Sequence, residues 1–234
     1  MVLHIVAIIA VLFLISVFFY KYSPSPSDIR LIQIEWDQIG TWPELRTEGQ
    51  PIIIRGAPTS VSPVWTTADL IERDLTLPHQ VLINTRESTK VVKQHLIDKW
   101  IASWFPQAYT ASPVLEHLAI FNYQAITGPQ PIHKTTSVST VIAPTDGEMI
   151  VSIAMPAVSD FLPIHWNNGF PKLTKVDTPF VGNIKYIDII LRPGTMLALP
   201  CHWYYSIDTP AEAFSLLLEC HSPISYFASK TLKR

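Results

Sequence analysis

Two short segments contain the side chains that are candidates for a functional site. The first reads Pro-Ile-His-Lys-Thr and places His133 two residues before Thr135. The second reads Leu-Pro-Cys-His-Trp-Tyr-Tyr-Ser-Ile over residues 199–207 and contains Trp203 and Tyr205. Because side chains alternate between the two faces of a strand, Trp203 and Tyr205 share a face. We also expect His133 to form a hydrogen bond with Thr135 or Tyr205.

Other ionisable residues leave a rebuilt metal site open as an alternative. They are three imidazoles and two carboxylates: His165, His202, His221, Asp146 and Glu148. His202 lies three residues from Tyr205, and odd separations along a strand point to opposite faces, so His202 should face away unless the turn extends to Trp203. We favour ordinary surface or hydrogen-bonded histidines, and we interpret the two acids as a solvated turn.

Composition and the remaining motifs exclude several classes of function. The net charge of −2, with 15% charged residues, predicts no nucleic-acid partner. The chain has no Gly-x-Ser-x-Gly elbow, no glycine-rich phosphate loop and no His-Glu-x-x-His. Cys201 and Cys220 are expected to be two separate buried thiols, because such thiols are often buried without pairing.

The elements that must hold these residues are mostly short strands. A β-branched run closed by glycine at 51–56 predicts a buried strand, and residues 29–36 predict an edge strand. Helices are expected at 66–73 and 91–105. Further strands are expected at 81–85, 137–143, 149–154, 186–191, 196–199, 203–207 and 214–219, with a hairpin tip at 167–169. This order favours an antiparallel sandwich or jelly roll with added helices.

The N-terminus is predicted to be a membrane segment. Val2 begins and Tyr20 ends a nearly continuous apolar run without Asp, Glu, Lys or Arg. At ~1.5 Å rise per residue this run nearly covers a ~30 Å hydrocarbon layer, and no small-residue cleavage site follows it. The first positive charge, Lys21, lies after the run and favours a cytosolic domain. We expect an anchor at 1–22, a tether and leading segment at 23–50, a globular domain at 51–226 and a basic, solvated tail at 227–234.

Three segments together resemble the JmjC and cupin-like 2-oxoglutarate oxygenase family. Residues 51–56 match that family's opening strand. His133, with Gly147 farther along, matches the strand that carries its first ligands. Residues 187–207 match the strand, Pro-Gly turn and strand that deliver its last ligand. The likeness covers roughly residues 51–223. It implies a mainly β double-stranded β-helix, or jelly roll, with a few flanking helices.

The resemblance also implies that the family's iron site is degenerate in this chain. It puts the first imidazole at His133, the carboxylate at Thr135 and the second imidazole at Tyr205. The basic residue that pairs with 2-oxoglutarate falls at Met149. Such iron is held by two imidazoles and one carboxylate, so three of four key positions are replaced. The expected result is a degenerate pocket of His133, Thr135, Met149, Trp203 and Tyr205, without catalytic residues, and with His133 as the only retained ligand position.

Three functions follow from these patterns. The favoured one is a single-pass membrane protein that is catalytically inactive, needs no cofactor, and acts as a binding or structural module for protein partners. The second is an Fe(II)/2-oxoglutarate-dependent hydroxylase with a non-standard ligand set. The third is a metal-free cupin that binds a small molecule in a cavity lined by Met149, Trp203 and Tyr205.

Overall fold

The computed structural model is mainly β, as predicted, and describes residues 2–21, 26, 28–61, 120–164, 166–210 and 213–231. The expected helices at 66–73 and 91–105, the expected strand at 81–85 and His165 lie outside these residues. The described strands are β1 (Ile32–Glu35), β2 (Ile52–Arg55), β3 (Ile120–Thr127), β4 (Gln130–Lys134), β5 (Ser139–Asp146), β6 (Met149–Ala154), β7 (Tyr186–Leu191), β8 (Thr195–Pro200), β9 (Tyr204–Asp208) and β10 (Phe214–His221).

Among the residues that the structure describes, helices are few and flank the strands. They are α1 (Val2–Lys21), α2 (Trp42–Leu45) and α7 (Pro223–Thr231). Short 3₁₀ helices occupy Trp36–Thr41, Arg46–Glu48, Pro58–Val61, Pro156–Asp160, Phe170–Lys172 and Val181–Asn183.

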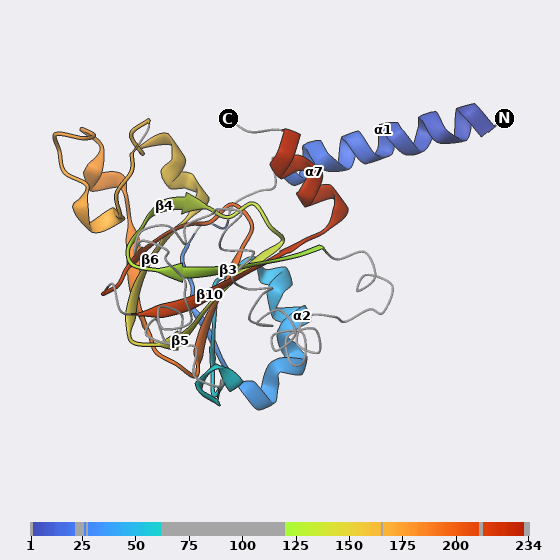
Figure 1. Ribbon diagram of the computed structural model, residues 1–234. Helices are drawn as coiled ribbons and strands as arrows, with labels where there is room; N and C mark the ends of the chain where they lie inside the picture. The colour runs from blue at the N-terminus through green and yellow to red at the C-terminus, as the bar shows by residue number, and fades with distance from the viewer. Residues whose placement is uncertain are drawn as a thin grey trace, which may run out of the picture.

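The strands form two sheets that face each other (Figure 1). The larger sheet has the order β1-β2-β8-β5-β10-β3, and the smaller has the order β4-β9-β6-β7. All pairings are antiparallel except β1 with β2. The smaller sheet places β4 beside β9, so both segments that carry candidate chemistry lie on neighbouring strands.

Alternation along the strands divides the buried apolar residues into layers. One cluster fills the space between the sheets and includes Met149, Leu199 and Trp203. A second covers the outer face of the larger sheet, where Trp42 of α2 packs against it. A third, around Phe170, covers the outer face of the smaller sheet. The fold is therefore a sandwich whose interior is shared by both sheets.

The predicted Pro-Gly turn is confirmed between β7 and β8. Gly194 has φ of 88°, in the left-handed region that glycine adopts without strain, and Thr195 N donates to Arg192 O at 2.9 Å. Between β5 and β6, Gly147 also has a positive φ, and an added Cβ would lie 2.8 Å from Ala213 Cβ. These glycines fix two of the sharp connections that set the strand register.

The expected hairpin tip at 167–169 is wrong. These residues lie in the long connection between β6 and β7, just before the 3₁₀ helix Phe170–Lys172. The backbone carbonyl of Asn168 accepts a hydrogen bond from Ile132 N at 3.1 Å, and the side chain of Ser206 bonds to Phe170 N. Contacts with the smaller sheet therefore decide the path of this segment, rather than local turn chemistry.

The two terminal helices pack against each other at one end of the sandwich (Figure 1). The rings of Phe13 and Phe227 meet edge to face, with centroids 5.4 Å apart, and Val17 is buried. Helix α7 runs through the boundary that the sequence suggested at residues 226 and 227, so part of the expected tail is helical. Within the described part of the chain, no helix combines the length and hydropathy needed to cross a membrane.

Candidate functional site

Thr135, the position expected to carry the carboxylate, lies outside the cavity described below. Its hydroxyl lies 2.7 Å from Pro200 O and 3.2 Å from Trp203 O, so these two carbonyls share its hydrogen. Its backbone N–H donates to Trp203 O at 2.8 Å. Strand β4 ends at Lys134, so strand alternation no longer orients the next side chain. Thr135 therefore fastens the end of β4 to the turn between β8 and β9.

Met149 and Trp203 were also expected to line the pocket, but both lie in the apolar core. Both are 1% exposed and belong to the apolar cluster between the sheets. The indole N–H of Trp203 donates to Gly49 O at 3.2 Å, which joins the turn before β9 to the segment before β2. Neither residue lines the cavity, because apolar neighbours surround both side chains.

His133 and Tyr205 do line the cavity, side by side. They are directly paired across β4 and β9, and their ring centroids are 5.8 Å apart. Neither side chain makes a hydrogen bond with another described residue, so the predicted bond from His133 to Thr135 or Tyr205 is not formed. These two residues form one wall of the cavity.

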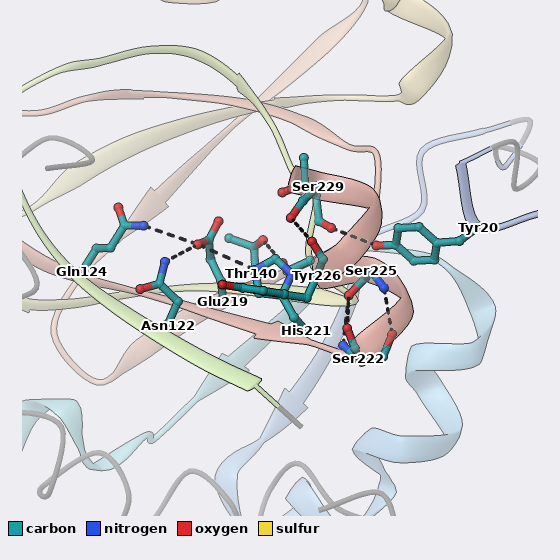
Figure 2. A network of polar contacts seen from close by, with 12 residues as sticks. Tyr20, Asn122, Gln124, Thr140, Glu219, His221, Ser222, Ser225, Tyr226 and Ser229 are labelled. Carbon is teal, nitrogen blue, oxygen red and sulfur yellow. Dashed lines mark hydrogen bonds and ion pairs between the residues drawn. The ribbon is translucent and has the colours of Figure 1, made fainter. Parts of the chain in front are cut away.

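The facing wall comes from β3 and β10 of the larger sheet and is polar. Asn122 Nδ2 donates to Glu219 Oε2 at 2.8 Å, and Gln124 Nε2 donates to the same oxygen at 3.3 Å (Figure 2). His221 Nε2 lies 4.0 Å from that oxygen. Strand alternation explains the grouping, because Leu217, Glu219 and His221 point inward while the residues between them join the outer core.

The neighbours of Glu219 keep it ionised. Burial alone would raise the pKa of this carboxyl, but the nearby imidazole of His221, the hydrogen bond from Asn122 and the charge of Lys230 act in the opposite direction. The net effect is a pKa below the ordinary value of a glutamate. The cavity thus contains a fixed negative charge at neutral pH.

The wall formed by His133 and Tyr205 is neutral at neutral pH. Burial lowers the pKa of His133, although the negative charge of Glu219 opposes that shift. Burial and the same negative charge both raise the pKa of Tyr205 well above its ordinary value. The phenol therefore keeps its proton, and the imidazole offers one donor and one acceptor nitrogen.

Several polar atoms in this cavity have no hydrogen-bond partner among the described residues. His221 Nδ1 is one of them, on a residue only 5% exposed. Both amides and the imidazole engage Oε2 of Glu219, which leaves Oε1 open. The ring nitrogens of His133 and the hydroxyl of Tyr205 are open as well. A buried polar atom is normally paired, so the open His221 Nδ1 points to a ligand or to ordered water in this cavity.

The cavity has a volume of about 910 Å³, and its rim is built by the terminal helices. Tyr20 at the end of α1, and Tyr226 and Lys230 of α7, line it together with Lys134 of β4. The hydroxyl of Tyr20 donates to Thr136 O at 3.0 Å (Figure 2). This volume falls in the range of small-molecule sites.

His202 lies at this rim, because the turn extends to Trp203 and β9 begins only at Tyr204. Its φ of 69° is a left-handed value, which is uncommon for a residue other than glycine. Its Nε2 lies 2.8 Å from Tyr20 O, the rings of the two residues are 5.3 Å apart, and burial lowers the pKa of this imidazole. The strained turn residue therefore ties α1 to the sandwich.

The remaining candidates lie elsewhere. Glu148 pairs with Arg192 on the surface at 2.6 Å, in agreement with a solvated turn around Asp146 and Glu148. Cys201 and Cys220 are not joined in a disulfide, as predicted, although Cys201 is only partly buried.

The sequence interpretation missed Glu219, Asn122 and Gln124 as cavity residues. It weighed His221 only as a spare imidazole. One signal was present: Glu219 ends the predicted strand at 214–219, and an acid inside a buried strand requires a partner.

The side chains at the expected ligand positions do not fit the iron site of the JmjC and cupin-like oxygenase family. Within the part of the chain that the structure describes, no three His, Cys, Asp or Glu side chains are grouped as metal ligands. At the expected ligand positions, Thr135 is bonded to backbone carbonyls and Tyr205 keeps its proton. The cavity resembles a polar binding pocket more closely than a metal centre.

Comparisons with known proteins add little. No protein-family model and no curated protein matches the chain. Among the 378 matching chains of solved structures is the cupin domain of Drosophila melanogaster CENP-C, with 15% sequence identity and a TM-score of 0.26. The match covers 48% of this chain and 63% of the CENP-C chain. The description of the fold therefore rests on the sheets themselves.

Proposed function

We propose that this protein is a binding module: its cavity holds a small polar molecule, α1 holds the domain at a membrane, and no iron chemistry takes place. The observation that carries the proposal is the set of open polar atoms on Glu219, His221, His133 and Tyr205 around one cavity. Catalytic inactivity is supported by the engagement of Thr135 with the turn between β8 and β9.

Metal and turnover measurements test the inactive character. The full chain is purified in detergent without oxygen, loaded with Fe(II) and analysed for bound iron and for succinate formed from 2-oxoglutarate. An active Fe(II)/2-oxoglutarate enzyme handled in parallel is the control. We expect less than stoichiometric iron and no succinate. Stoichiometric iron with 2-oxoglutarate-dependent succinate formation would overturn the proposal.

One observation favours the hydroxylase alternative. Glu219 brings a carboxylate into the cavity that contains His133, so a non-standard ligand set would include these two residues. In that case Glu219→Gln would abolish both iron retention and succinate formation in the same assay. This double loss from an active wild-type protein would establish the alternative.

Membrane attachment is supported by the surface of α1. Apolar side chains are exposed around the helix, including Leu12 at 58% and Phe19 at 69%. Such continuous apolar exposure marks a contact with lipid or with another protein. We propose lipid as the partner, with the domain on the cytosolic side because Lys21 follows the apolar run.

Flotation with protein-free vesicles distinguishes lipid from a protein partner. The wild type should float with phosphatidylcholine vesicles and resist alkaline extraction. Substitution of the exposed Ile8 and Leu12 by Lys should abolish flotation, because charges in hydrocarbon are costly. The matched control is Val176→Lys, which changes an apolar residue 96% exposed on the connection between β6 and β7. A wild type that stays with the soluble fraction would remove the membrane part of the proposal.

A further inference from the structure

The two ends of the cavity differ in charge, and this difference restricts the ligand. The inner end is formed by Glu219, His221, Asn122 and Gln124. The rim carries the ammonium groups of Lys134 and Lys230. The inference rests on the proposed binding function and names the chemical class of the ligand.

The inner end favours a cationic hydrogen-bond donor. Asn122 and Gln124 each donate one amide N–H to Glu219 Oε2. Glu219 Oε1 accepts no hydrogen bond from a described residue. An ionised carboxylate accepts hydrogen bonds only, so its open oxygen requires a donor from the ligand. A primary ammonium supplies three such donors and neutralises the buried charge.

The wall opposite Glu219 suits the same group. The rings of Tyr205 and His133 stand side by side, and an aromatic face attracts a cation. The neutral imidazole of His133 also offers one acceptor nitrogen to an ammonium. In contrast, the carboxylates of 2-oxoglutarate would face the negative charge of Glu219, and His221 is the only basic residue among the four that form the inner end.

The rim favours an anionic group on the same ligand. Lys230 lies close enough to Glu219 for its charge to act on that carboxylate. Lys134 and Lys230 also stack on tyrosine rings, with Nζ 5.7 Å from the centre of Tyr204 and 5.6 Å from the centre of Tyr226. These contacts hold the two ammonium groups at the lining of the cavity, where they favour an anionic group.

We propose that the cavity binds a phosphoethanolamine unit, with the ammonium at Glu219 and the phosphate between Lys134 and Lys230. Two sources share this chemistry: the free molecule and the headgroup of phosphatidylethanolamine. The rim is formed in part by α1 and α7, which carry the exposed apolar surface, so a headgroup can enter from the lipid side.

The test uses the full chain in nanodiscs of phosphatidylcholine and isothermal titration with four probes: phosphoethanolamine, ethanolamine, phosphocholine and inorganic phosphate. Phosphoethanolamine should bind best. Phosphocholine should bind about tenfold more weakly or worse, because its quaternary nitrogen has no N–H to donate. Nanodiscs that contain phosphatidylethanolamine distinguish the sources, because a bound headgroup would compete with the free probe.

Matched variants assign the two ends. Glu219→Gln should weaken phosphoethanolamine by about tenfold or more, as expected for loss of a charged hydrogen bond, and should leave phosphate unchanged. Lys230→Ala should weaken phosphoethanolamine and phosphate but not ethanolamine. Glu148→Gln, at the exposed ion pair with Arg192, is the control and should change nothing. Melting curves confirm that each variant is folded.

Failure of this inference is distinguishable from failure of the proposed function. Equal binding of phosphoethanolamine by wild type and folded Glu219→Gln would overturn the assignment of the ammonium. The ligand class would be overturned if millimolar phosphoethanolamine does not bind the protein in phosphatidylcholine nanodiscs and phosphatidylethanolamine in the nanodiscs does not change the titration. In either case the binding module stands unless iron and succinate are found.

Discussion

The space between the two sheets has an apolar half and a polar half, and the same strands build both. On β9, Ile207 lies in the apolar cluster, whereas Tyr205 also reaches the cavity. On β10, Leu217 borders the apolar side and is followed at the next inward positions by Glu219 and His221. The apolar half is almost fully buried, whereas His133, Asn122 and Glu219 in the polar half are only partly buried, so the halves differ in both side chains and exposure.

The apolar half of the interior stabilises the fold, and the polar half does not. Burial of an apolar side chain stabilises the fold in proportion to the area removed from water. Burial of Glu219 and of an unpaired His221 nitrogen opposes folding unless bonds compensate. The polar half is therefore retained at a cost to stability, which supports a role in binding.

The largest expected effect is in the apolar half. Trp203→Ala should lower the free energy of unfolding by about 3–5 kcal/mol, because it leaves a large cavity and removes the bond to Gly49. Urea denaturation followed by circular dichroism measures it. His133→Ala, in the polar half, should cost clearly less. Equal losses would remove the distinction between the two halves.

Thr135→Val tests the junction between the two halves. The substitution keeps the size of the side chain but removes the hydroxyl that donates to Pro200 O and Trp203 O, while the backbone N–H of Thr135 still donates to Trp203 O. A loss of about 1–3 kcal/mol in the free energy of unfolding is expected. The control is Thr47→Val, whose exposed hydroxyl donates to Glu44 O and should matter little. If Thr135→Val is neutral, its hydroxyl is not needed to hold the turn.

Sequence reasoning predicted the strands more fully than the cavity. Strands β6 and β7 were predicted with their observed bounds, because their flanking turns and alternation are local signals. The facing of β10 and β4 depends on sheet order, which brings Glu219 near His133 across a long stretch of chain. Thr135 was misplaced because the end of β4 depends on bonds from the distant turn before β9.

The pH dependence of stability separates the polar half from the apolar half, which has no such dependence. Burial lowers the pKa of His133, so between the folded pKa and about 6.5 the unfolded chain binds a proton that the fold does not. The free energy of unfolding should therefore fall as the pH drops below about 6.5, by at most about 1.4 kcal/mol per pH unit for this group.

His133→Gln should reduce that slope in urea titrations between pH 7.5 and 5. His202 has a lowered pKa for the same reason, so His202→Gln should remove a further part. The pKa of Glu219 is also lowered, which places its contribution below about pH 4.5 and outside this window. An unchanged slope in the double variant would show that neither imidazole is neutral because of burial.

The smallest effect is expected where the same chemical change is made outside the sandwich interior. Glu148→Gln removes one carboxylate, as Glu219→Gln does, but the ion pair of Glu148 with Arg192 is exposed, with side-chain exposures of 47% and 70%. Solvent screens such a pair, so the free energy of unfolding should change by less than about 0.5 kcal/mol. Glu219 is 19% exposed and has three partners on one oxygen, so its replacement must rearrange two amides and an imidazole. Urea denaturation of the wild type and of both variants in 0.05 M and 0.5 M salt measures the two changes in the free energy of unfolding. Salt weakens exposed ion pairs more than buried ones, so only the small effect of Glu148→Gln should depend on salt. If Glu148→Gln is as costly as Glu219→Gln, burial of the charge does not distinguish the cavity from the surface.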